Sequence, residues 1–170
     1  LWAADGKEKK SKSHLKKAEK IAGDNPQAMA SVAGTYLLLQ NGKDALRIYK
    51  KLVASHPQSF EAHIALAGAY AMLKDIDLAK KYAKMAAELN PKAPQPHQLL
   101  AQIAASKSDA STAESELLKV LKLAPKSLET RMALADLYSQ TKKFDKAASQ
   151  LEQVLKAQPK AQGINNSLCQ

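Results

Sequence analysis

Residues 58–91 read QSFEAHIALAGAYAMLKDIDLAKKYAKMAAELNP, and this stretch contains the pattern that decides the fold. Its last residue, Pro91, stands 34 residues after Pro57, and the same interval leads on to Pro125 and Pro159. A chain that repeats itself at a fixed period of this length is an array of one supersecondary unit. The sequence therefore predicts a repeat protein whose stability is spread along the array rather than held in one central core.

Two helices fit each repeat, because the recurring apolar positions within a repeat are three, four or seven residues apart. Pro91 ends the second of them after Asn90, since a residue before proline avoids helical backbone angles. Ala67 and Ala79 are small, so the axes of the two helices can approach closely. The recurring positions are Leu66, Leu100, Leu134 and Leu168; Ala33, Ala67, Ala101, Ala135 and Cys169; Tyr36, Tyr70, Ala104 and Tyr138; and Ala45, Ala79, Ala113 and Ala147.

These residues resemble the tetratricopeptide repeat, whose 34-residue pattern is W-x2-L-G-x2-Y, then A-x3-F, then P. The stretch above holds His63-x2-Leu66-Ala67-x2-Tyr70, then Ala79-x3-Ala83, then Pro91. The resemblance implies an all-α fold, an α-solenoid of antiparallel helix pairs wound into a right-handed superhelix. The sequence departs from the family at the tryptophan position, which is occupied by Met29, His63, His97 and Arg131.

The phase of the repeats predicts both the domain organisation and the helices. Residues 26–59, 60–93, 94–127 and 128–161 form four repeats, 1–25 end a preceding one, and 162–170 begin another. Trp2 and Gly6 match the register of an earlier first helix, and the chain is interpreted as a fragment of a longer array. Helices are predicted near 10–22, 26–39, 43–55, 59–73, 76–89, 94–106, 109–123, 127–140 and 144–157.

The composition limits the classes of partner. Lys and Arg number 26 against 16 Asp and Glu, a formal net charge of +10 that favours acidic partners. Many lysines stand between packing positions of second helices, where we expect them in solvent, and few aromatic residues are free to stack on bases. The sequence therefore argues against specific nucleic-acid binding. The longest apolar run, 64–73, is too short to span a bilayer. Leu1 to Asp5 also fit the tail of a secretory signal, and the composition leans weakly towards a bacterial periplasm or cell envelope.

No catalytic, cofactor or metal-binding constellation stands out, so the sequence predicts a non-enzyme without cofactors. His63 and His97 recur because they share the tryptophan position, which indicates helix packing. His14 and His56 have no ligand-spaced partners. The single cysteine, Cys169, holds the small packing position of Ala67, so it is interpreted as structural.

The resemblance implies that first helices line a concave groove that holds a polypeptide. At the positions where some family members hold a terminal carboxylate with basic residues this chain has none, which argues against such a clamp. The main hypothesis is a protein-interaction scaffold. The alternative is a structural spacer in a bacterial envelope secretion or polysaccharide-export assembly, and self-association through the chain ends is a further hypothesis. The predicted groove residues are Gln27, Ala30, Leu37, Leu38, Glu61, Ile64, Met72, Gln95, Gln98, Gln102, Glu129, Met132 and Asp136.

Overall fold

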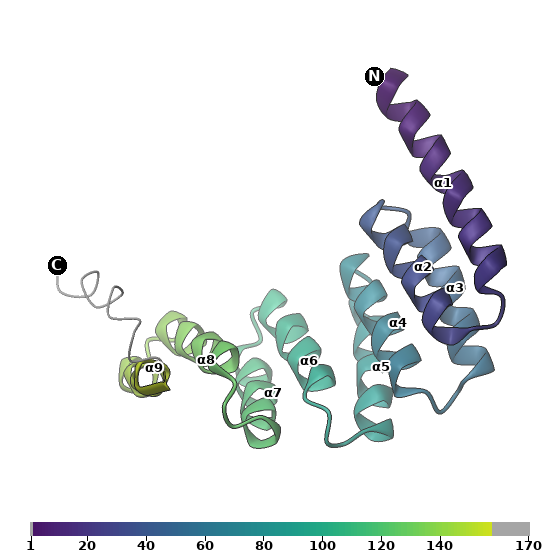
Figure 1. The fold of residues 1–170 in the computed structure, drawn as a ribbon. Helices are drawn as coiled ribbons and strands as arrows, with labels where there is room; N and C mark the ends of the chain where they lie inside the picture. Colours follow the sequence, from purple (N-terminus) through teal and green to yellow (C-terminus); the bar gives the residue numbers. More distant parts are fainter. Residues whose placement is uncertain (1, 158–170) are drawn as a thin grey trace. The chain divides into compact units, whose positions relative to one another are not determined.

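The protein is entirely helical over the part that its structure, a computed structural model, describes, which is residues 2–157. Within this range the chain forms helices and no strand, so the predicted all-α class is confirmed (Figure 1). The helices are α1 (Trp2–Ala22), α2 (Pro26–Leu38), α3 (Gly42–Ser55), α4 (Phe60–Met72), α5 (Ile76–Leu89), α6 (Gln95–Ser106), α7 (Ala110–Leu123), α8 (Leu128–Gln140) and α9 (Phe144–Ala157).

The helices group into two compact units that divide between Pro91 and Lys92. In the first unit α1 contacts α2, each of the helices α2 to α5 packs on the next, and α2 also touches α4. In the second unit α6, α7, α8 and α9 pack in the same consecutive manner. Each predicted repeat thus contains one helix pair, whereas its borders stay a prediction. The predicted start of a further repeat at 162–170, with Leu168 and Cys169, lies outside the described residues.

The first helix differs from the prediction. It was expected to begin near residue 10, with Trp2 and Gly6 belonging to an earlier first helix, but α1 runs without a break from Trp2. A glycine permits a helix to end but does not require it, and inside a helix it costs only about 1 kcal/mol relative to alanine. The presence of Gly6 at this position of the repeat therefore does not interrupt α1.

Side-chain caps and prolines set most helix ends where the sequence placed them. The backbone N–H of Ala28 donates to Asn25 Oδ1 at 3.0 Å, and that of Ala62 donates to Ser59 Oγ at 3.1 Å. Such caps satisfy amide groups that a helix start would otherwise leave without a partner. Helices α3, α5 and α7 each end two residues before one of the recurring prolines, as the repeat pattern predicts.

The turn inside each helix pair contains one residue with a positive φ. The following residue's N–H then bonds to a carbonyl five positions back, as from Asn41 to Tyr36 at 2.8 Å. This is the usual left-handed end of a helix, which normally favours glycine. The four residues recur at the 34-residue interval, although none is glycine: Gln40 (56°), Lys74 (63°), Ser108 (57°) and Lys142 (58°).

The recurring small and apolar positions form the core of both units. The leucine, alanine and tyrosine positions that the repeat pattern predicted are buried throughout the described repeats. Gly42, at the start of α3, is also buried, and a Cβ added there would overlap the side chain of Leu73. The small residues thus allow close helix contacts, as predicted. Those buried in the recurring alanine positions are Ala33, Ala67, Ala101, Ala135, Ala45, Ala79, Ala113 and Ala147.

Ion pairs join helices that are distant in the sequence. In the first unit Arg47 on α3 binds Glu19 on α1 through two hydrogen bonds of 2.7 and 2.8 Å. In the second unit Glu114 on α7 accepts hydrogen bonds from Lys143 at 2.8 Å and from the Tyr138 hydroxyl at 3.0 Å. The bond from Lys143 is the main reason that the pKa of Glu114 lies below its ordinary value.

This lowered pKa predicts how the protein responds to acid. A carboxyl group with a lower pKa in the folded state stabilises the fold above its unfolded pKa, about 4.3, and this contribution disappears as the pH falls through the folded value. We expect Glu114→Gln to lose less stability than the wild type between about pH 5 and pH 3. Urea unfolding at a series of pH values would measure this. The control is Glu152→Gln, because Glu152 is an exposed residue of α9. Equal acid slopes for the wild type and Glu114→Gln would contradict the prediction.

Candidate peptide-binding grooves

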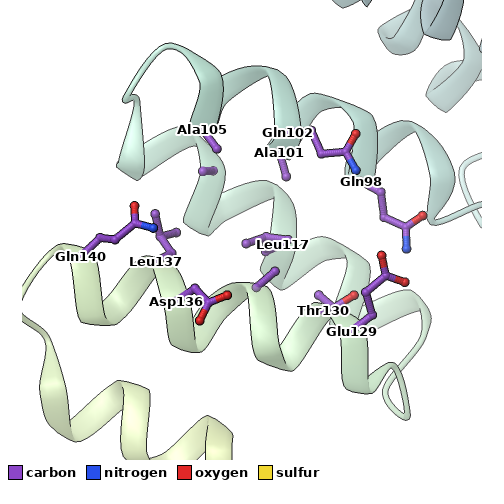
Figure 2. A pocket seen from close by; sticks show the side chains of 12 residues that line it. Gln98, Ala101, Gln102, Ala105, Leu117, Glu129, Thr130, Asp136, Leu137 and Gln140 are labelled. Atoms are coloured by element: carbon purple, nitrogen blue, oxygen red, sulfur yellow. The ribbon is translucent and has the colours of Figure 1, made fainter. Parts of the chain in front are cut away.

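The second unit contains a groove of about 290 Å³ between helices α6, α7 and α8 (Figure 2). We call it the acidic groove. Its floor is apolar, with Leu117 from α7 at the centre, and its rims are polar. The residues that line it are Gln98, Ala101, Gln102, Ala105, Ala113, Leu117, Glu129, Thr130, Ala133, Asp136, Leu137 and Gln140.

The helical repeat explains the two rims. On α8, Glu129, Asp136 and Gln140 are separated by seven and four residues, so they lie on one face of the helix. On α6, Gln98 and Gln102 are four residues apart and form the opposite rim. Figure 2 shows Gln98 and Glu129 at one end of the groove and Gln140 at the other. The arrangement offers carboxylates and amides above an apolar floor of alanines and Leu117.

The charge of this groove is opposite to that of the chain. No lysine, arginine or histidine lines it, although the chain has a net charge of +10. Within the described residues, neither Glu129 nor Asp136 forms an ion pair with a basic side chain. Two carboxylates outside the groove are paired in the same unit, since Lys119 binds Glu116 at 2.8 Å and Lys143 binds Glu114 at 2.8 Å. The groove therefore presents two carboxylates that no basic side chain of the described residues neutralises.

A second groove lies in the first unit, between α2, α4 and the end of α3, with a volume of about 390 Å³. It is less charged than the acidic groove. Its single carboxylate, Glu61, accepts a hydrogen bond of 3.1 Å from the Ser59 hydroxyl, and His56 stands beside it in the lining. The lining residues are Pro26, Gln27, Ala30, Leu52, His56, Ser59, Glu61, Ala62 and Ala65.

The predicted groove residues divide into two sets. Seven line one of the two grooves, namely Gln27, Ala30 and Glu61 in the first unit and Gln98, Gln102, Glu129 and Asp136 in the second. The others, Leu37, Leu38, Ile64, Met72, Gln95 and Met132, line neither. Leu38 and Met72 are nevertheless 80% and 62% exposed, so they lie on the surface. For all of them, a role in binding stays a prediction.

Sequence reasoning missed the residues that second helices contribute. Leu117 and Ala113 come from α7 and line the acidic groove. Leu52 from α3 and His56, which directly follows α3, line the groove of the first unit. The prediction considered only the outward faces of first helices. The signal that could have found Leu117 is its place in the A-x3-F part of the pattern, four residues after Ala113.

The two recurrent histidines are packing residues, as predicted. His63 is buried, with its Nδ1 2.8 Å from the carbonyl oxygen of Ser59. The side chain at the tryptophan position meets the residue nineteen positions further on in the second helix of the repeat. The ring centroids of His63 and Tyr82 are 6.1 Å apart. His97 Nδ1 lies 2.6 Å from Glu116 Oε2, and Arg131 Nη1 donates to Gln150 Oε1 at 3.2 Å.

Among residues 2–157, of which the side chains of residues 10–157 are described, no group of three or more described His, Cys, Asp or Glu side chains is arranged to hold a metal ion. No helix in that range combines the length and the apolar character needed to cross a bilayer. The acidic groove, which combines an apolar floor with carboxylate and amide rims, is the candidate binding site.

The consecutive packing of paired helices defines a helical repeat protein, and comparison with known proteins identifies its family. The sequence model of the tetratricopeptide repeat matches residues 37–103 and 104–164. The chain belongs to this family, as the motif predicted. No curated protein sequence matches it significantly.

Solved structures of the same fold include bacterial and peptide-bound examples. MamA has a TM-score of 0.76 at 20% identity over 95% of this chain and 94% of its own. TTC0263, a tetratricopeptide repeat protein of Thermus thermophilus, has a TM-score of 0.72 at 26% identity over 98% and 91%. The first such domain of RPAP3, solved with the HSP90 peptide SRMEEVD, has a TM-score of 0.63 at 18% identity over 68% and 94%. Below 25% identity, such likeness shows the fold alone.

Proposed function

We propose that this protein is a non-catalytic scaffold that binds a polypeptide segment in the acidic groove. Proteins of the tetratricopeptide repeat family serve in general as scaffolds for protein–protein interaction. The observation that carries the proposal is the groove itself, an open concavity with a floor of small apolar side chains between two polar rims. A floor of this kind accepts apolar side chains, and amide rims can bond to the exposed backbone of an extended chain.

The related RPAP3 domain supports the proposal, because that protein was solved with a bound peptide. The titratable side chains that line the grooves are Glu129 and Asp136 in the acidic groove and His56 and Glu61 in the second, and the non-catalytic role stays a prediction. The envelope-spacer role stays a prediction, as do localisation and self-association. For the spacer role the grooves would be incidental, so a test of groove binding also separates the two hypotheses.

Filling the groove tests the proposal. Ala105 is exposed on α6 at the edge of the groove, so Ala105→Trp is expected to place an indole over the floor without disturbing the core. Peptides are first selected with the wild-type chain from a random displayed library and then synthesised. We expect Ala105→Trp to weaken their binding at least about tenfold, the change that 1.4 kcal/mol produces.

The matched control is Ala148→Trp, which adds the same side chain to an exposed position of α9 outside the groove. Isothermal titration calorimetry gives the affinities, and circular dichroism confirms that both variants keep the helical fold. If no peptide is selected, or if both variants bind selected peptides as tightly as the wild type, the acidic groove is not a polypeptide-binding site.

A further inference from the structure

We propose that the occupant of the acidic groove is a basic segment of a partner protein, with two Lys or Arg side chains three positions apart and a small apolar side chain between them. This inference rests on the proposed function, because it names the chemistry of the polypeptide that the groove would hold. One basic side chain would lie at Glu129, the other at Asp136, and the apolar one on the floor around Leu117.

Charge complementarity is the first argument. The groove contains two carboxylates without a basic partner among the described residues, in a chain that has ten more basic than acidic side chains. Glu114, by contrast, is bound by both Lys143 and Lys146 outside the groove. Lys119, Lys143 and Lys146 of the second unit thus pair with carboxylates that do not line the acidic groove. An incoming cation would find its counter-ions on the α8 rim, beside low-dielectric walls that strengthen the attraction.

The spacing of the two carboxylates sets the spacing of the two cations. Glu129 and Asp136 are seven residues apart on α8, which corresponds to about 10 Å at the rise of an α-helix. An extended polyproline II segment turns once every three residues and advances about 9 Å in doing so. Side chains three positions apart on such a segment point the same way. The spacing of two such side chains, about 9 Å, is close to the spacing of about 10 Å between Glu129 and Asp136 along α8.

The amides on the rims suit the same kind of occupant. Gln98 and Gln102 on α6 and Gln140 on α8 offer both donors and acceptors. A polyproline II segment has no internal hydrogen bonds, so its backbone carbonyl and N–H groups remain available to these amides. The floor of alanines around Leu117 leaves room for a small apolar side chain but offers no polar partner.

The proposal predicts selectivity against acidic peptides. The peptide SRMEEVD, which was solved with the RPAP3 domain, is net negative and serves here as the acidic probe. In the acidic groove its carboxylates would face Glu129 and Asp136 without a compensating cation from the lining. The basic probe is a capped peptide, Gly-Ser-Lys-Ala-Leu-Lys-Ser-Gly. A neutral probe replaces both of its lysines with glutamine, and a spacing probe separates them by one additional alanine.

The test titrates each probe into the full chain at low salt and follows the backbone amide signals of α6 and α8 by NMR. We expect the basic probe to bind about five- to tenfold more tightly than the neutral probe, since two ion pairs near a surface contribute modestly. The spacing probe should fall between them, and SRMEEVD should not shift these signals. Rising salt should weaken the basic probe selectively.

The double variant Glu129→Gln with Asp136→Asn should reduce binding of the basic probe to the level of the neutral one. Its control is Asp145→Asn with Glu152→Gln on α9, which makes the same change in net charge at exposed positions outside the groove. All four side chains are exposed, so both variants should keep the wild-type spectrum away from the substituted positions. Equal loss in both variants would show a general charge effect and overturn the proposal.

The remaining outcomes separate this inference from the proposed function. If neutral or acidic probes shift the groove signals as strongly as the basic one, the groove binds polypeptides but the basic partner is wrong. If no probe shifts these signals while the peptides selected from the library do, the inference of a basic partner is wrong and the proposed function stands. If sedimentation of the free chain shows self-association that the groove variant abolishes, the occupant is a second copy and the separate partner is wrong.

Discussion

Replacing Leu134 with alanine is expected to lower the free energy of unfolding by about 2–5 kcal/mol, the range for a buried leucine whose removal leaves a cavity. Leu134 is 0% exposed on α8, and it forms a cluster with Tyr138 and Ala147. Leu117 and Leu121 on α7 pack against the same cluster. The cluster joins α8 to both α7 and α9, so the site cannot easily collapse around the gap.

The matched control is Leu118→Ala on α7, where the leucine is 46% exposed. A surface change of this kind should stay within about 0.5 kcal/mol. Urea unfolding provides both values, and amide exchange of α8 shows that the loss belongs to the second unit. Similar losses for the two variants would mean that Leu134 does not occupy the core that the repeat register assigns to it.

The helices could be predicted from the sequence because most of their boundaries have a local cause. Prolines at the 34-residue interval end the second helices, and capping residues such as Asn25 and Ser59 begin the first ones. All of these helices were predicted from the repeat phase, and α1 is the exception because no local signal supports the predicted start near residue 10. The register assigned Trp2 and Gly6 to a separate, earlier first helix, yet α1 runs without a break from Trp2 to Ala22.

The rims of the acidic groove could also be predicted, because they depend only on spacing along one helix. Glu129 and Asp136 share a face of α8 whatever the neighbouring helices do. The floor could not be predicted in the same way. Leu117 reaches it only because α7 packs behind α6 and α8, and this depends on tertiary contacts that the periodicity of a single helix does not contain.

The contacts between the helices of a pair show the same limit. The sequence indicated that His97 packs between helices, but it did not identify Glu116 as its partner. The pairing follows from the length of the turn and from how far the two helices overlap. Ala104 illustrates the opposite case, since it occupies the tyrosine position of the pattern and is nevertheless buried. A position in the register thus predicted burial more reliably than it predicted a contact.

Replacing Ala67 with leucine is expected to destabilise the first unit by about 1–3 kcal/mol, the usual cost of forcing additional methylene groups into a packed core. Ala67 lies on α4 and Ala79 on α5, both are 0% exposed, and these two helices pack directly on each other. The small side chains set the separation of the two axes, so the additional carbons must move one helix or adopt an unfavourable rotamer.

The control for this prediction is Ala54→Leu, which makes the same change at an exposed position of α3. Thermal unfolding followed by circular dichroism compares the two variants with the wild type. We expect only Ala67→Leu to lower the midpoint, and a second substitution, Leu66→Ala, should not restore it, because the neighbouring side chain on a helix points to a different side. If Ala67→Leu unfolded like the wild type, α4 and α5 would not be held together by the small residues of the repeat, and the 34-residue alanine pattern would need another physical cause.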